Sequence, residues 1–333
     1  MPIRVLEHSS TVLKANLPGD PTTRRLWVYL PPGYEQSGLR YPVLWCLPAY
    51  GSTGAQLVAG NRWSPGLPAR IDHLVANGCR PVIAVFPDCF TRWGGSQYLD
   101  SPATGDYERY LCDELVPFVD AELRTLVDRD ARGILGRSSG GYGALRLCMR
   151  RPDLFGAFAC HSGDMGFALC YTPDFPRCVD ALARAGSIEA WVERFESTEK
   201  KRGEEFAVVS VLAMAAAYSP DTSLPHGIRL PFDLSTGELI PEIWELWRQN
   251  DPVQMIDRPE AITALNSMRL AFFDCGTRDE HRLHLGLRLL QNRLDSHEIA
   301  YELETFDAGH RSIGYRHDVG VPKLARALLE ARE

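Results

Sequence analysis

The segment 136–140, Gly-Arg-Ser-Ser-Gly, constrains the fold of this chain more than any other stretch. It lies between an apolar run and a helical pattern that Pro152 stops. A serine with glycines two residues before and two after fits a sharp strand-to-helix turn, because small residues let the strand and the helix approach closely. Ser138 is the apex of that turn. Ser139 does not fit the role, since Arg137 would then stand where glycine is needed. We therefore interpret Ser138 as a candidate nucleophile.

The rest of the chain alternates short apolar runs with helical patterns, which is typical of an α/β fold. The first part, 3–30, alternates polar and apolar residues and predicts an antiparallel edge region. Continuous apolar runs predict buried strands at 43–47, 82–86, 133–135, 157–160, 270–273 and 300–306. Helical spacing predicts helices at 106–126, 140–150, 281–296 and 322–332.

One long stretch, 163–258, has no pattern of a buried strand. It carries helical patterns at 188–200, 204–218 and 241–250, joined by proline-rich connections. Because ligands of open α/β sheets bind at the carboxyl ends of the strands, an insertion of this kind is typical of a lid over that edge. The sequence thus predicts a core formed by 1–162 and 259–333, interrupted by a helical lid at 163–258.

A serine hydroxyl needs an adjacent base, usually a histidine that a carboxylate orients. The strand–turn–helix arrangement places these partners in the chain order serine, acid, histidine. His310 follows the last predicted strand and is the expected base. Asp279 follows the strand before it and is the favoured acid. The alternatives that stay open are Asp274, Glu280 and Asp164.

The same chemistry needs backbone donors for the oxyanion of a tetrahedral intermediate. The amide of Ser139, directly after the nucleophile, is the first expected donor. The second is expected from the loop after the strand at 43–47, where Tyr50 or Gly51 offers an amide. His161 follows another strand of the same edge and is a candidate pocket residue, as is Arg137.

Composition excludes several classes of function. The 36 basic and 43 acidic residues give a net charge of −7, and the sequence has no long basic run, which argues against a nucleic-acid partner. It also has no apolar stretch long enough to span a membrane, which argues against a membrane partner. None of the nine cysteines forms a C-x-x-C pair, and His281 and His284 have no third metal-ligating residue nearby. We therefore predict neither a metal nor a cofactor. The first ten residues lack the apolar segment of a signal peptide, which predicts a cytoplasmic protein.

Several motifs together resemble one family. They are Val-Tyr-Leu-Pro-Pro-Gly-Tyr at 28–34, the loop from Leu47, Gly-Gly-Ser-Gln-Tyr-Leu-Asp-Ser at 94–101, Tyr-Glu-Arg-Tyr-Leu at 107–111, the segment 136–140, Cys-Gly at 275–276 with Asp279, and Gly309-His310. In these motifs the chain is similar to the "putative esterase" family of α/β-hydrolases. That family includes S-formylglutathione hydrolases, feruloyl and enterochelin esterases and mycolyltransferases.

The resemblance implies an α/β-hydrolase fold and a triad of Ser138, Asp279 and His310. It also implies that the loop 93–101, with Trp93 and Ser96, lines the substrate pocket. The expected activity is hydrolysis of a small carboxylic ester through an acyl-enzyme. Acyl transfer and thioester hydrolysis use the same residues and stay open. So does a homodimer through the lid helices. A non-catalytic binding protein on this fold is less favoured, because all three residues are present in the right order.

Overall fold

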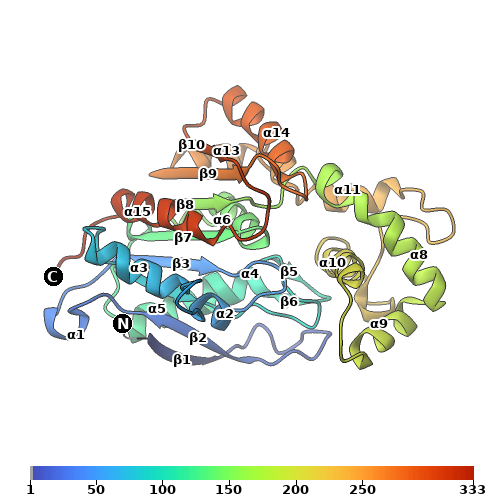
Figure 1. Ribbon diagram of the computed structural model, residues 1–333, viewed down its shortest axis with the longest axis horizontal. Helices are drawn as coiled ribbons and strands as arrows, with labels where there is room; N and C mark the ends of the chain where they lie inside the picture. Colours follow the sequence, from blue (N-terminus) through green and yellow to red (C-terminus); the bar gives the residue numbers. More distant parts are fainter. Residues whose placement is uncertain (1–2) are drawn as a thin grey trace.

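In the computed structural model, which describes residues 3–333, an eight-stranded sheet has the order β1-β2-β4-β3-β7-β8-β9-β10 (Figure 1). The first two of the ten N-terminal residues considered above lie outside the described range. The strands are β1 (Ile3–Ser9), β2 (Thr23–Tyr29), β3 (Val43–Leu47), β4 (Ile83–Phe86), β7 (Arg132–Arg137), β8 (Ala157–His161), β9 (Leu270–Gly276) and β10 (Glu302–Phe306). A short hairpin joins β5 (Asp100–Ser101) and β6 (Gly105–Asp106).

The sheet is parallel except at one edge. β1 pairs with β2 and β2 with β4 in antiparallel register, and all later neighbours are parallel. The predicted antiparallel edge and the six predicted strands are confirmed. β3, β4, β8 and β9 are buried along their whole length, as expected for parallel strands covered on both faces. Because β7, β8, β9 and β10 run the same way, the loops that follow them meet at one edge.

Helices cover both faces of the sheet (Figure 1). One face packs against α3 (Leu67–Ala76) and α15 (His317–Ala327). The other packs against α5 (Val116–Glu122), α6 (Ser139–Arg150), α13 (Pro259–Asn266) and α14 (Leu283–Ser296). Side chains of β3 alternate between the two cores, with Leu44 and Cys46 in the first and Val43 and Trp45 in the second. Two short helices, α1 (Tyr34–Ser37) and α2 (Gly54–Val58), lie in the early loops.

Two predicted helices differ from the structure. The stretch 106–126 consists of α4 (Tyr107–Arg109), a π-helical segment (Tyr110–Leu115) and α5. The last helix begins at His317, so Pro322 lies inside it instead of at its start. A proline there removes one helical hydrogen bond. Burial of Val321 and Leu324, both 0% exposed against the sheet, outweighs that loss.

Within 163–258, all of which the structure describes, no residue joins either sheet. The helices there are α7 (Phe167–Cys170), α8 (Phe175–Ala185), α9 (Ile188–Ser197), α10 (Gly203–Tyr218), α11 (Pro241–Arg248) and α12 (Pro252–Met255). Figure 1 shows α8, α9 and α11 to the right of the sheet, with α10 between them and the core. α10 is apolar on all sides, which is typical of a buried helix. No helix of the described residues 3–333 could cross a membrane.

Candidate active site

Ser138 sits at the turn between β7 and α6 in a strained backbone conformation. Its φ is 56° and its ψ is −127°, a region that few non-glycine residues adopt. Its amide donates to the carbonyl of His161 on the neighbouring strand, at 2.9 Å. The glycines on either side are needed for close packing. A Cβ on Gly136 would lie 2.4 Å from the backbone of Gly140, and a Cβ on Gly140 would lie 2.3 Å from the carbonyl oxygen of Leu47.

The structure brings Ser138, His310 and Asp279 into one hydrogen-bonded chain. The Ser138 hydroxyl lies 3.0 Å from Nε2 of His310, and Nδ1 of His310 lies 2.7 Å from Oδ2 of Asp279. His310 follows β10 and Asp279 follows β9, so three parallel strands deliver the three side chains to one edge. When Nδ1 donates to the carboxylate, Nε2 is left as an acceptor that faces the serine hydroxyl.

Asp279 is buried with its charge well compensated. Its Oδ1 accepts from the amides of His281, at 2.9 Å, and Leu283, at 3.5 Å, at the start of α14. Burial raises the pKa of Asp279, but the hydrogen bond and charge of His310 and these amides outweigh it, so the net pKa is below the usual value. The neighbouring thiol of Cys275 is buried, which raises its pKa to about 12 and keeps it protonated.

The three alternative acids contact other groups. Glu280 accepts from the backbone amide of His310 at 2.5 Å and so holds the loop that carries the ring. Asp274 binds Nδ1 of His161 at 2.9 Å and Nε of Arg316 at 2.8 Å, inside the core. Asp164 lies at the site, with Oδ1 3.3 Å from the Ser138 hydroxyl, but it has no hydrogen bond to His310 among the residues described.

Asp164 belongs to a polar network that the sequence did not indicate. Its Oδ2 accepts from the Tyr171 hydroxyl at 3.0 Å and from the Gln97 amide at 3.4 Å. Gln97 also donates to the Tyr218 hydroxyl at 2.9 Å and accepts from the Ser139 hydroxyl. Burial raises the pKa of Asp164, and the charge of His310 and these hydrogen bonds offset only part of that rise. Gln97 lies in the 94–101 motif, whereas Tyr171 and Tyr218 carry no motif that could have identified them.

The two candidates for the second oxyanion donor are not equivalent. The Gly51 amide donates to the carbonyl of Gly94 at 2.8 Å and is therefore occupied. Among residues 3–333 the Tyr50 amide has no such acceptor. The Tyr50 hydroxyl donates to the carbonyl of Trp93 at 2.6 Å. This hydrogen bond joins the loop after β3 to the loop that contains Trp93. Ser139 is the first residue of α6, and first-turn amides of a helix lack helical acceptors.

A cavity of about 200 Å³, here called the serine cavity, opens beside these groups. Its walls include Tyr50, Arg137, Ser138, Asp164 and His310. Asp164 belongs to the segment 163–258, which also contributes Cys170, Tyr171, Asp174, Phe206, Ser210 and Met214.

The other expected pocket residues lie elsewhere. Trp93 and Ser96 are buried and do not line the serine cavity, and the Ser96 hydroxyl accepts from the Tyr98 amide. The side chain of His161 points into the core against Gly320, away from the pocket edge where the sequence placed it. Its backbone carbonyl, not its ring, contacts the turn. Within residues 3–333 no cluster of metal-ligating side chains was found.

Comparisons with known proteins show what the chain is similar to. The model of a family described as "Putative esterase" matches residues 21–319. An endo-1,4-beta-xylanase/feruloyl esterase of Xylanibacter ruminicola is 30% identical over 141 residues, which make up 41% of this chain and 19% of that protein. An esterase of Mycobacterium tuberculosis is 30% identical over 141 residues, 41% of this chain and 28% of that protein. The aligned part thus spans less than a third of either relative.

Solved structures cover nearly the whole chain. A ferulic acid esterase matches with a TM-score of 0.64 at 19% identity, over 98% of both chains. An S-formylglutathione hydrolase from Agrobacterium tumefaciens matches with a TM-score of 0.59 at 18% identity, over 98% of this chain and 95% of that one. At such identities the likeness concerns the fold, and it confirms the predicted α/β-hydrolase class with its mostly parallel, helix-flanked sheet.

Proposed function

The chain belongs to the esterase family described as "Putative esterase", and we propose that it is a serine hydrolase that cleaves carboxylic esters through an acyl-enzyme. The observation that carries this proposal is the hydrogen-bonded chain from Asp279 through His310 to the strained Ser138. A serine activated by an oriented histidine, beside backbone donors, is the arrangement that acyl transfer from an ester requires.

In the proposed reaction the Ser138 oxygen attacks the ester carbonyl while Nε2 of His310 takes the hydroxyl proton. Asp279 keeps the Nδ1 proton in place and stabilises the imidazolium that forms. The amides of Ser139 and Tyr50 donate to the oxyanion of the tetrahedral intermediate. The C–O bond to the alcohol then breaks and the alcohol leaves with the proton from His310. A water molecule, deprotonated by His310, releases the acid from Ser138 in the second half.

The segment 163–258 acts in this proposal as a lid that shapes the substrate cavity. Its support is that seven of the residues around the serine cavity come from this segment, among them Tyr171, Phe206 and Met214. Phe206 packs edge to face on Tyr50, with ring centroids 5.4 Å apart, so the lid touches the proposed oxyanion loop directly.

The proposal is tested with a fluorophosphonate probe and with p-nitrophenyl esters of graded chain length, assayed beside a panel of thioesters. The wild-type chain is expected to be labelled and to hydrolyse the short esters. Ser138→Ala should abolish labelling and lower kcat by about 10⁶-fold, because the nucleophile itself is removed.

Ser296→Ala is the matched control, since Ser296 is exposed at the end of α14 and its hydroxyl only donates to the Arg293 carbonyl. This variant should be labelled like the wild type. An unlabelled wild-type chain, or equal labelling of Ser138→Ala, would contradict the proposed function.

A further inference from the structure

An arginine without a partner lies next to the proposed nucleophile. Among residues 3–333 the Arg137 guanidinium has neither a hydrogen bond nor an ion pair, although the residue is partly buried. Burial lowers the pKa of Arg137, and no carboxylate offsets the effect. Burying a charge without a partner is costly, so such a group is a candidate for pairing with a ligand.

The buried arginines of the described chain behave differently, because each has a carboxylate partner. The pairs are Arg24–Asp88 at 3.7 Å, Arg132–Asp120 at 2.6 Å, Arg146–Glu108 at 2.5 Å and Arg316–Asp274 at 2.8 Å. The fold thus neutralises guanidinium groups wherever it buries them for structural reasons. Arg137 departs from that pattern at the one position directly beside Ser138.

Arg137 lies between two cavities. One is the serine cavity, and the other, here called the elbow cavity, has a volume of about 290 Å³ and lies between the turn at 136–137, α2, α3 and the start of α15. Arg137 and Ala49 line both cavities. One arm of an ester whose carbonyl sits at Ser138 could therefore extend past Arg137 into the elbow cavity.

The elbow cavity carries positive charge and no acidic side chain. Its basic lining residues are Arg70, Arg137 and His317, and Arg70 is already paired with Asp318 at 2.7 Å. His317 is 9% exposed, and its Nδ1 has no partner among the described residues. Burial and the neighbouring charges hold the pKa of His317 well below its usual value, so this ring is neutral near pH 7. The charge left uncompensated is that of Arg137.

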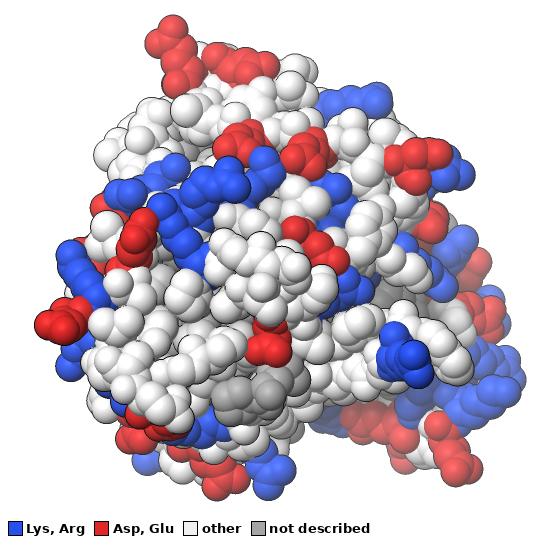
Figure 2. Space-filling view, turned by 60° about the vertical axis from the view of Figure 1, so that its left-hand side comes forward, with Lys and Arg blue, Asp and Glu red and all other residues white. Residues whose placement is uncertain are grey.

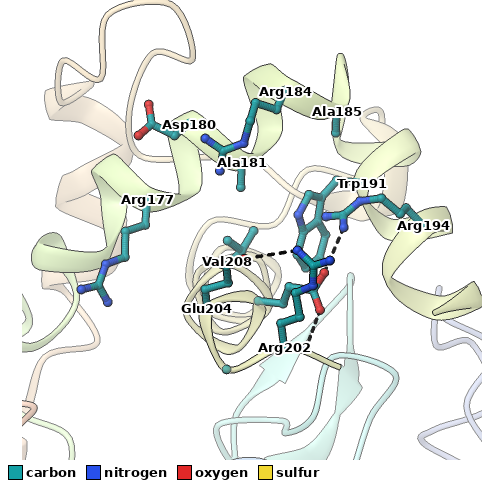
Figure 3. A pocket seen from close by; sticks show the side chains of 12 residues that line it. Arg177, Asp180, Ala181, Arg184, Ala185, Trp191, Arg194, Arg202, Glu204 and Val208 are labelled. Atoms are coloured by element: carbon teal, nitrogen blue, oxygen red, sulfur yellow. Dashed lines mark hydrogen bonds and ion pairs between the residues drawn. The ribbon is translucent and has the colours of Figure 1, made fainter. Parts of the chain in front are cut away.

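Around another cavity most of the arginines have carboxylate partners. A larger cavity of about 720 Å³ within the lid is surrounded by Arg177, Arg184, Arg194 and Arg202 (Figure 3). Three of these lie near carboxylates, in the pairs Arg177–Asp174, Arg194–Glu205 and Arg202–Glu204. Over the face shown in Figure 2, Lys and Arg side chains lie among Asp and Glu side chains.

We propose that Arg137 binds a carboxylate carried by the substrate in the elbow cavity, so that the enzyme prefers esters with a carboxylate a few bonds from the ester group. A guanidinium offers a planar pair of N–H donors that matches a carboxylate. The volume of the elbow cavity suits a short arm, and Leu47, Leu57 and Leu67 line its walls for the methylene groups. This inference rests on the proposed function, since it takes the ester carbonyl to lie at Ser138.

The test compares kcat/KM for two matched pairs of esters, each a free acid and its methyl ester. Mono-4-nitrophenyl glutarate carries the carboxylate on the acyl side, and 4-acetoxybenzoate carries it on the alcohol side. Release of the phenol is followed in every case. The wild-type chain is expected to prefer the acid in one pair. Arg137→Met should lower the acid-to-methyl-ester ratio of kcat/KM by about 10- to 100-fold, the usual effect of losing a charged hydrogen bond.

Gln56→Glu provides a second variant that keeps Arg137. Gln56 lines the elbow cavity and accepts from the Thr53 amide in a capping box, which glutamate also forms. The new charge should repel the carboxylate and lower the same ratio. Arg288→Met, which removes an exposed arginine on α14, should leave the ratio unchanged.

The possible outcomes distinguish failure of this inference from failure of the proposed function. If the wild-type chain hydrolyses the methyl esters, but the ratio is equal in wild type, Arg137→Met and Gln56→Glu for both pairs, the carboxylate site is overturned and the serine hydrolase stands. If the wild-type chain is labelled by the fluorophosphonate probe but hydrolyses neither member of either pair, the carboxylate site is overturned and the serine hydrolase stands. If it is neither labelled nor active on these esters, the proposed function fails, and the carboxylate site with it. Should Arg137→Met fail to fold, Gln56→Glu decides alone.

Discussion

At the scale of single residues, two aspartates flank the proposed catalytic serine and histidine. Asp279 contacts the ring of His310, whereas Asp164 contacts the hydroxyl of Ser138. Asp279→Asn should lower kcat by about 10⁴-fold, because an amide no longer holds the Nδ1 proton. Asp164→Asn should lower kcat far less. Steady-state kinetics on one ester measures both variants, and the reverse order of effects would assign the orienting role to Asp164.

The same two residues predict opposite dependences of stability on pH. The pKa of Asp279 is lower in the folded chain than in the unfolded chain, where it is about 3.9, so its charge stabilises the fold above that value. That contribution is lost as the pH falls through the folded pKa. The pKa of Asp164 is raised by burial, so its charge destabilises the fold at pH values above its folded pKa, and this cost disappears below about pH 3.9.

Thermal unfolding from pH 8 to about pH 2 tests these signs. At pH 8 Asp164→Asn should have a higher Tm than the wild type, and Asp279→Asn a lower one. The difference for Asp164→Asn should shrink as the pH falls toward 4, whereas that for Asp279→Asn should persist to about pH 4 and shrink only below it. A Tm for Asp164→Asn below that of the wild type at pH 8 would mean that its hydrogen bonds with Tyr171 and Gln97 outweigh its burial.

Residues at strand ends in the expected chain order could be predicted, whereas residues that reach the site through packing of the segment 163–258 could not. Ser138, Asp279 and His310 follow from chain order and strand ends, because parallel strands deliver their loops to one edge. Tyr171 and Tyr218 reach the site from helices whose positions depend on tertiary packing. His161 was expected in the pocket because it ends a strand, but its side chain lies on the face of the sheet that α15 covers.

At the scale of elements, the close approach of α6 to β7 and to the loop after β3 defines the turn. Gly140→Ala would place a Cβ 2.3 Å from the Leu47 carbonyl oxygen and 2.7 Å from that of Pro48. Both oxygens belong to backbone that leads to Tyr50, so they cannot move without shifting the proposed oxyanion loop. We expect a loss of about 1–3 kcal/mol in the free energy of unfolding, together with a loss of activity.

Gly203→Ala is the matched control on a helix. A Cβ at Gly203 meets no atom within 4 Å, and its φ is not positive, so the substitution should stabilise the fold by up to about 1 kcal/mol. Denaturant unfolding measures both variants. Equal midpoints for Gly140→Ala and the wild type would mean that the strand and the helix separate freely at the turn.

Strand positions were predictable because continuous apolar runs identify strands that are buried on both faces. Helix boundaries were harder to predict. The pattern 106–126 hides a π-helical segment, since one extra residue per turn barely alters the spacing of apolar side chains. Pro322 suggested a helix start, and only the contacts of Val321 and Leu324 with the sheet explain why the helix continues through it. Local sequence does not contain such contacts.

At the scale of the whole molecule, the segment 163–258 shares its apolar core with the sheet. One continuous cluster of buried side chains includes Trp45 and Phe158 from strands and Leu212 and Trp247 from the inserted helices. The Ser101 hydroxyl also donates to the carbonyl of Ala216 on α10, at 2.6 Å. A shared core favours unfolding of sheet and lid together, because neither part keeps its buried surface without the other.

Trp247 is the residue at which this coupling can be tested. It is 0% exposed, donates to the Ser219 hydroxyl at 2.8 Å, and has ring centroids 5.9 Å from Tyr171 and 5.5 Å from Tyr218. Trp247→Ala should lower the free energy of unfolding by about 3–5 kcal/mol. It should also lower kcat/KM, since both tyrosines lose the packing that holds the network around Asp164.

Two probes follow the unfolding of this variant. Tryptophan fluorescence reports on both parts, since Trp191 and Trp244 remain in the segment 163–258 of this variant and four tryptophans lie outside it. Far-ultraviolet circular dichroism follows the whole fold. The two transitions should coincide and shift together. Leu246→Ala, a change at a 38% exposed neighbour on α11, should shift them little. If the transitions of Trp247→Ala split into two steps, with only the first at lower denaturant, the segment 163–258 would be an independent unit, and its contacts with the sheet would add little to the stability of either part.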